Sequence, residues 1–211
     1  MPSLTAVKLV KSLLQEGDKG CLMFPLPFPE AVKVVEWSEE HIPDDQLSEE
    51  GREHEIHATC LYGFSPILRP RDVAMLVQSF ALQTKREKLA IKLGKIGRFK
   101  HPEQDVLKVE VDTHEASDLA DLHFYLRELL EPRGLVEVDY PEFNAHITLA
   151  YVKPGALPEL DGHGEFEGNV YTTDLLVYSA PDSKFKCGIT LDGGLVEESL
   201  IKTFTQELLV G

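Results

Sequence analysis

The chain has 211 residues, of which 43% are hydrophobic, and a formal net charge of −15. This length and hydrophobic content exclude a disordered chain and are enough for one large domain with a buried core. The negative charge argues against long duplex DNA or RNA as a ligand, because such ligands bind basic surfaces, but a small anion can still bind in a locally basic pocket.

Helices and strands alternate along the chain. Some segments carry apolar residues at helical spacing, and others are short apolar or alternating runs bounded by glycine, proline or charged residues. The acidic run from Ser38 to Glu55 lies between two such segments, and we interpret it as a solvated loop. In chain order the predicted elements are helix Leu4 to Gln15, strand Cys21 to Phe28, helix Pro29 to about His41, strand Glu55 to Tyr62, helix Pro70 to about Leu82, strands Leu89 to Phe99 and Asp105 to Asp112, helix Asp118 to Leu130, and strands His146 to Val152, Val170 to Tyr178 and Phe185 to Leu191.

The alternation predicts an α+β protein of two lobes that pack closely together, because helix and strand segments interleave twice without a flexible linker. We expect a main domain at 20–192, an N-terminal helical extension at 1–19 and a C-terminal amphipathic tail at 193–211. Apolar residues of the tail recur at helix-compatible spacing. A helix with such a face must bury it. Burial against a second copy would make the terminal helices the interface of a homo-oligomer, and docking on the chain's own lobe is the alternative.

A short motif occurs twice within the predicted strands. The sequence EIHATCLYGF contains His57 and the sequence NAHITLAYVK contains His146, and in both a threonine follows two residues later and a tyrosine five residues later. Residues i and i+2 of a strand point to the same face, so each histidine projects together with its threonine while the residue between them packs. Two such strands placed side by side, or related by a pseudo-twofold, would gather two imidazoles and two hydroxyls around one spot.

This set of side chains suits displacement at phosphorus. Imidazole titrates near neutral pH, so one ring can accept a proton while the other donates one. A threonine hydroxyl can donate a hydrogen bond to a phosphoryl oxygen and hold it. For one motif alone, a half-buried strand histidine with a satisfied hydrogen bond is an equally good interpretation, but the repeat favours catalysis. The predicted catalytic residues are His57, Thr59, His146 and Thr148.

The two motifs resemble the signature of the 2H phosphoesterase superfamily, which carries two His-x-Thr or His-x-Ser motifs on two pseudo-symmetric lobes. FNAHITLAYVKPG is similar to the second motif region of the RNA-ligase-like branch, and EIHATCLYGF, which an acidic segment precedes, is similar to the first motif region of phage-type members. The resemblance covers roughly Gly20 to Leu191. It implies a bilobal, pseudo-symmetric α+β fold with antiparallel sheets lining a central cleft and helices outside. It also implies a histidine pair that acts as acid and base, and threonines that grip the phosphate.

The resemblance further implies a substrate class. The family handles 2′,3′-cyclic phosphates, 2′–5′ linkages and cyclic oligonucleotide messengers, and some phage members degrade the cyclic nucleotides of bacterial antiphage signalling (the anti-CBASS enzymes). We expect a hydrolase without metal or cofactor, a phosphodiesterase that acts on small cyclic oligonucleotides. One alternative is a 2′,3′-cyclic phosphodiesterase or a 2′–5′ RNA-end processing enzyme. Another is a module that binds a nucleotide without cutting it.

Six further residues are candidates for holding the substrate. Aromatic rings can stack on bases and basic side chains can contact phosphate, although core packing and solvated surface are their alternative roles. The sequence HEIH does not predict a metal site, because residues three apart face opposite sides of a strand. The candidates are Trp37, Tyr62, Tyr151, Lys95, Arg98 and Lys153.

The sequence predicts a cytoplasmic protein, in the host cytoplasm if it is viral, without membrane contact. No apolar run approaches the roughly 20 residues that span a bilayer, and the N-terminus lacks the apolar core of a secretory signal. The three cysteines, Cys21, Cys60 and Cys187, have no CxxC spacing and fit reduced thiols better than a disulfide framework.

Overall fold

The computed structural model describes residues 19–196, apart from 28, 67, 85, 114–117, 139–141 and 182–184. The predicted helix Leu4 to Gln15 and the tail beyond Val196 lie outside the described residues. The start of the tail differs from the expected helix, because Leu195 pairs with Ile189 and extends the sheet as a short strand.

Ten strands and three α-helices form the described part of the chain. The strands pair antiparallel in one sheet. The helices are α2 (Glu30–His41), α3 (Pro70–Thr84) and α4 (Asp118–Leu130). The strands are β1 (Gly20–Pro25), β2 (Leu47–Arg52), β3 (His57–Phe64), β4 (Leu89–Lys100), β5 (Asp105–Val111), β6 (His146–Val152), β7 (Val170–Thr173), β8 (Leu175–Ser179), β9 (Lys186–Thr190) and β10 (Leu195–Val196).

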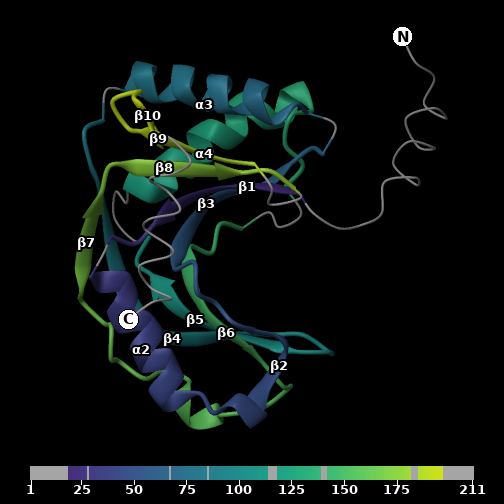
Figure 1. Cartoon of the computed structure of the whole chain (residues 1–211), viewed down its shortest axis with the longest axis vertical. Helices are drawn as coiled ribbons and strands as arrows, with labels where there is room; N and C mark the ends of the chain where they lie inside the picture. Colours follow the sequence, from purple (N-terminus) through teal and green to yellow (C-terminus); the bar gives the residue numbers. More distant parts are fainter. Residues whose placement is uncertain are drawn as a thin grey trace, which may run out of the picture.

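The sheet is strongly curled. Its strand order is β10-β9-β8-β1-β3-β6-β5-β4-β7, and β2 pairs with β6 as well. Only Asp174 separates β7 from β8 along the chain, yet β7 pairs with β4 whereas β8 pairs with β1 and β9. The strand predicted over Val170 to Tyr178 is therefore two strands. The curl that brings the β7 edge next to β8 gives the half-barrel seen in Figure 1.

The helices cover the outer side of this sheet. Figure 1 shows α3 and α4 over the half that contains β1, β3 and β8, and α2 beside the half that contains β4, β5 and β6. The buried side of α4 carries Leu119, Leu122, Leu126 and Leu130 at helical spacing, which explains why this segment folds as an amphipathic helix against the sheet. No helix of the described residues is both long and apolar enough to cross a membrane. The expected α+β architecture is confirmed.

The acidic run that we expected to be a loop contains β2. This strand pairs with β6 through Leu47 opposite Val152 and Arg52 opposite Ala150. Arg52 makes pairing of such an acidic segment favourable, because its guanidinium bonds to the carboxylate of Asp44 and to backbone carbonyls at the end of α2 and just beyond it. The loop prediction is therefore wrong for residues 47–52. The acidic charge pattern alone does not indicate a strand, because the partner strand lies about 100 residues away in the sequence.

Candidate active site

The two motif strands lie side by side at the centre of the sheet. Ala58, the middle residue of the first motif, pairs with Ile147, the middle residue of the second, and both are fully buried. The antiparallel register then places each histidine opposite the threonine of the other motif, and directly opposite residues point to the same face. A local twofold through the Ala58–Ile147 pair interchanges the motifs. The residues gathered on the face opposite this buried pair are His57, Thr59, His146 and Thr148.

Both imidazoles are held in the same way. Nδ1 of His57 bonds to the backbone carbonyl of Glu55, and Nδ1 of His146 bonds to that of Asn144 at 2.7 Å. A carbonyl oxygen only accepts hydrogen bonds, so Nδ1 donates in each case and the neutral ring presents the lone pair of Nε2. Among the described residues neither Nε2 has a hydrogen-bond partner. Each ring is therefore fixed by the backbone and has one nitrogen available for proton transfer.

A bulge in each motif strand turns the shared tyrosine onto the histidine face. On a regular strand a residue five positions after the histidine would point the other way, because side chains alternate. Cys60 in β3 and Leu149 in β6 are extra residues without a partner in the neighbouring ladder, so the alternation shifts by one after them. Tyr62 and Tyr151 consequently join the histidines and threonines. They lie close enough that Tyr62 is among the charges raising the pKa of Tyr151, although burial is the main cause.

The strands that flank the two motifs differ in charge. On β5, Lys108 and Glu110 stand opposite the threonine and the histidine of the second motif. On β1, the matching positions beside the first motif are occupied by Met23 and Pro25. The site is thus symmetric in its histidines and threonines and asymmetric in its surroundings.

Lys108 is a buried lysine that the sequence analysis did not single out. Its side chain is 4% exposed, and its Nζ bonds to the carboxylate of Glu110 and lies 4.2 Å from the centroid of the Phe99 ring. The same ring meets His146 edge to face, with centroids 4.9 Å apart. Gly97 leaves room for this arrangement, because a Cβ there would come within 2.4 Å of the Glu110 carboxylate. In the sequence, Lys108 and Glu110 look like the solvated side of an alternating strand, which is why no signal identified them.

Burial lowers the pKa of His146 below its usual value. The positive charges of Lys108 and His57 act in the same direction, whereas the hydrogen bond to Asn144 and the charge of Glu110 oppose the shift. The effect of His57 on His146 is consistent with the diagonal placement of the two histidines across the strand pair. A lowered pKa keeps His146 neutral at neutral pH, which is the form that can accept a proton.

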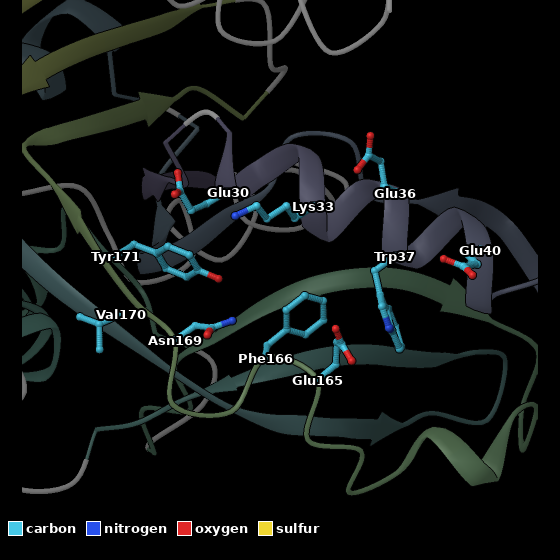
Figure 2. Close-up of a pocket in the computed structure, with 10 residues that line it drawn as sticks. All are labelled: Glu30, Lys33, Glu36, Trp37, Glu40, Glu165, Phe166, Asn169, Val170 and Tyr171. Carbon is cyan, nitrogen blue, oxygen red and sulfur yellow. The ribbon is translucent and has the colours of Figure 1, made fainter.

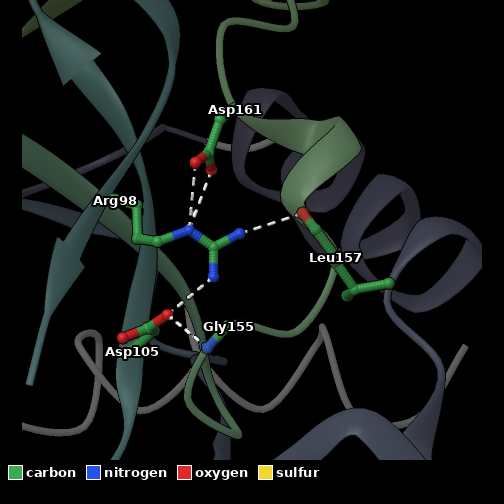
Figure 3. A network of polar contacts seen from close by, with 5 residues as sticks. All are labelled: Arg98, Asp105, Gly155, Leu157 and Asp161. Atoms are coloured by element: carbon green, nitrogen blue, oxygen red, sulfur yellow. Dashed lines mark hydrogen bonds and ion pairs between the residues drawn. The ribbon is translucent and has the colours of Figure 1, made fainter. Parts of the chain in front are cut away.

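Arg98 lies on the other face of the sheet. It pairs in register with Leu107, which belongs to the buried face of β5. Its side chain is 4% exposed, and its guanidinium bonds to the carboxylates of Asp105 and Asp161 and to the carbonyl of Leu157, each at 2.9 Å (Figure 3). Arg98 therefore fastens the segment that follows β6 onto β4, and its charge is already matched by two carboxylates.

Trp37 is buried on α2 and packs with other aromatic rings. It stacks on His41 at a centroid distance of 4.4 Å and meets Phe166 edge to face at 5.4 Å. With Phe166 and Tyr171 it forms the aromatic part of a pocket of about 450 Å³ between α2 and the start of β7, rimmed mainly by glutamates (Figure 2). This pocket contains neither motif histidine.

The two remaining predicted lysines contact loops. Lys95 of β4 is exposed, and its Nζ lies 4.0 Å from the carboxylate of Glu167. Lys153 follows β6, and its Nζ donates to the carbonyl of Asp45 at 2.6 Å. Lys153 thus ties the end of the second motif strand to the 3₁₀ turn Asp44–Gln46 that precedes β2.

The cysteines near the motifs remain protonated thiols. Burial raises the pKa of Cys60 well above its usual range and that of Cys21 to about 12. Cys21 also interacts with the Thr59 hydroxyl. Within the described ranges, no group of three or more His, Cys, Asp or Glu residues is arranged to hold a metal ion.

Comparison with known proteins identifies the fold. No family model and no curated protein matches the sequence. Among solved structures, Escherichia coli LigT in complex with 3′-AMP aligns with a TM-score of 0.56 at 17% identity, covering 78% of this chain and 88% of LigT. Kluyveromyces marxianus Usb1 with uridine monophosphate gives 0.54 at 8% identity, covering 82% of this chain and 98% of Usb1. TT0787 of Thermus thermophilus gives 0.54 at 18% identity, covering 83% of this chain and 98% of TT0787. All three belong to the 2H phosphoesterase superfamily, and the fold of this chain is the fold of that superfamily.

Proposed function

We propose that the chain is a metal-independent phosphodiesterase that hydrolyses small nucleotides, with His57 and His146 as an acid–base pair and Thr59 and Thr148 as ligands of the phosphate. One observation carries the proposal. The two motifs meet at the Ala58–Ile147 pair, so that two imidazoles with free Nε2 atoms and two hydroxyls share one face of the sheet. Two unrelated strand histidines would not be expected to share one face with the same backbone bond at Nδ1 and a threonine opposite.

The geometry suits in-line displacement at phosphorus. The neutral histidine takes a proton from the attacking water as its oxygen forms a new bond to phosphorus. The protonated histidine gives its proton to the oxygen that leaves as the old P–O bond breaks. The threonine hydroxyls donate hydrogen bonds to the non-bridging oxygens, whose negative charge increases in the transition state. These donors and the histidinium supply the charge stabilisation that a metal ion supplies in other phosphodiesterases.

Three features support a small nucleotide as substrate. LigT and Usb1, which have this fold, have structures with 3′-AMP and with uridine monophosphate, respectively. Tyr62 and Tyr151 stand on the histidine face, where their rings can stack on a base. The net charge of −15 disfavours long RNA. Within this class we favour cyclic oligonucleotides, including the cyclic messengers of antiphage signalling, because the first motif region resembles phage-type members.

The proposal is tested by a product assay. The protein is incubated in EDTA with a panel of cyclic di- and trinucleotides, 2′,3′-cyclic mononucleotides and 2′–5′ linked dinucleotides, and the products are identified by mass. We expect cleavage of a cyclic oligonucleotide. Cleavage of the 2′,3′-cyclic or 2′–5′ substrates alone would indicate an RNA-end processing enzyme, and activity that needs Mg²⁺ or Mn²⁺ would contradict the metal-independent mechanism.

The histidines are tested in the same assay. His57→Ala and His146→Ala should each lower kcat by at least about 10²-fold, because each removes one of the two proton-transfer groups. His101→Ala, at an exposed histidine outside the strands, is the matched control and should keep full activity. Either motif variant cleaving at the native rate would disprove the assigned pair. Tight binding of a nucleotide without any product would favour the binding module instead.

A further inference from the structure

The two histidines of the site are related by a local twofold, yet acid–base catalysis needs them in different protonation states. Both rings have the same backbone bond at Nδ1, and each stands opposite the threonine of the other motif. The residues within the two motifs therefore do not distinguish the ring that acts as the acid from the ring that acts as the base. The difference has to come from the strands on either side.

The flanking strands differ by one charged pair. The histidine of the first motif has Pro25 opposite it on β1, and its threonine has Met23. The second motif has Glu110 and Lys108 at these positions. The side chain of Lys108 is 4% exposed, whereas that of Glu110 is 47% exposed. Water screens the charge of the glutamate more than that of the lysine, so the electrostatic potential around the buried Lys108 ammonium is positive.

Phe99 links this charge to the second histidine. Lys108 Nζ lies over the face of the ring at 4.2 Å from its centroid, and the ring meets His146 edge to face. The two contacts place the ammonium and the imidazole against the face and the edge of one aromatic ring. A proton added to His146 would therefore be repelled by a fixed, poorly screened cation.

We propose that Lys108 breaks the symmetry of the histidine pair: its buried ammonium favours neutral His146, which makes His146 the base and His57 the acid. Lys108 is in this view a positioning residue, since it acts through His146. The assignment of base and acid rests on the proposed phosphodiesterase function, whereas the electrostatic effect on His146 does not. Among the residues that the structure describes, the charged and titratable groups that act on His146 are Lys108 and Glu110 from β5 and His57 from β3.

The electrostatic part is tested without substrate, by following the imidazole ¹⁵N signals of His146 with pH. Lys108→Met should raise the titration midpoint of His146 by about half a pH unit or more, because it removes a neighbouring cation. Glu110→Gln should lower the midpoint, because it removes the opposing anion. Lys108→Arg should leave it near the native value. Lys92→Met is the matched control, since Lys92 is an exposed lysine of β4 whose Nζ pairs with Asp112. Shifts of opposite sign at Lys108 and Glu110 cannot arise from general loss of structure, and a midpoint unmoved by Lys108→Met overturns the inference.

The catalytic part is tested by the pH dependence of kcat/KM. A base must be neutral, so the rate falls as pH drops through its pKa. The acidic limb of the profile should move upward in Lys108→Met by the shift seen for His146, and downward in Glu110→Gln. An acidic limb that stays in place while the His146 midpoint moves would overturn the assignment of His146 as the base. A protein that cleaves nothing but shows both midpoint shifts would refute the proposed function and leave the effect of Lys108 on His146 standing.

Discussion

The two motif threonines have different surroundings although they occupy equivalent positions. Thr59 lies beside the Cys21 thiol, which burial keeps protonated. Thr148 stands opposite Lys108, whose charged side chain is buried. At the scale of single residues, the hydroxyls should therefore act as equal hydrogen-bond donors to the phosphate, while the electrostatic field around them differs.

Thr59→Val and Thr148→Val test this role of the hydroxyls. Valine keeps the shape and strand preference of threonine, so folding should survive. Loss of a donor to the transition state should lower kcat by about 10²-fold to 10³-fold, or roughly 3–4 kcal/mol, in each variant. Thr→Ser at the same positions should retain most of the activity. Steady-state kinetics decide the matter, with Thr172→Val as a control because Thr172 is an exposed strand threonine of β7. Unchanged kcat/KM in both valine variants would leave the threonines as packing residues.

At the scale of elements, the bulges of β3 and β6 shape the site. A bulge frees a backbone carbonyl from the ladder, and each freed group finds a partner elsewhere. The carbonyl of Leu149 accepts from the backbone N–H of Glu53 at 3.0 Å. The carbonyl of Cys60 accepts from Nδ1 of His123 on α4 at 2.7 Å. His123 is buried and stacks on Phe143 at a centroid distance of 3.9 Å. A helix side chain thus supports the bulge that turns Tyr62 toward the histidines.

Replacement of His123 should weaken the fold in a pH-dependent manner. His123→Leu leaves the Cys60 carbonyl buried without a donor, which should cost about 1–3 kcal/mol of unfolding free energy at pH 7. Burial lowers the pKa of His123 in the folded protein, so the unfolded state binds a proton more readily. The contribution of neutral His123 is therefore complete above its unfolded pKa and is lost as pH falls below that value.

Urea unfolding at pH 7.5 and pH 5.5 measures both effects. The native protein should lose more stability on acidification than His123→Leu does, and His101→Leu, at an exposed histidine, should behave like the native protein. Equal losses in native protein and His123→Leu would show that His123 does not titrate with unfolding.

Some of these features can be predicted from the sequence and others cannot. The His-x-Thr spacing fixes which side chains share a strand face, and helical spacing of leucines identifies α4, because both patterns are local. The bulges at Cys60 and Leu149 cannot be predicted, since a bulge depends on the register of a partner strand. Arg98 was a candidate for phosphate contact because its carboxylate partners belong to other segments, Asp105 to the next strand and Asp161 to a loop 63 residues away. Lys108 looked solvated because its neighbour Phe99 comes from another strand.

At the scale of the whole molecule, the two halves of the sheet have matching strand orders. One half runs β3, β1, β8 outward from the centre, and the other runs β6, β5, β4. The local twofold at the Ala58–Ile147 pair therefore extends to three strands on each side. Within the described residues, β3 and β6 share this single ladder pair, whereas β5 and β6 share six. Along the chain, Asp174 alone separates β7, which pairs with β4, from β8, which pairs with β1.

The short β3–β6 ladder, which we call the seam, affects how the sheet can move. The β3–β6 ladder is the shortest between neighbouring strands of the described sheet, so we expect the sheet to bend most easily there, with the Ala58–Ile147 pair as the hinge. Opening about this hinge would change the separation of the two imidazoles, one on each half, without breaking the longer ladders. Amide hydrogens on the seam side of β3 and β6 should then exchange faster than those between β5 and β6, and 3′-AMP bound across both halves should slow them. Hydrogen exchange followed by NMR would show this, and equal protection at the seam and between β5 and β6 would mean that the sheet moves as one rigid shell.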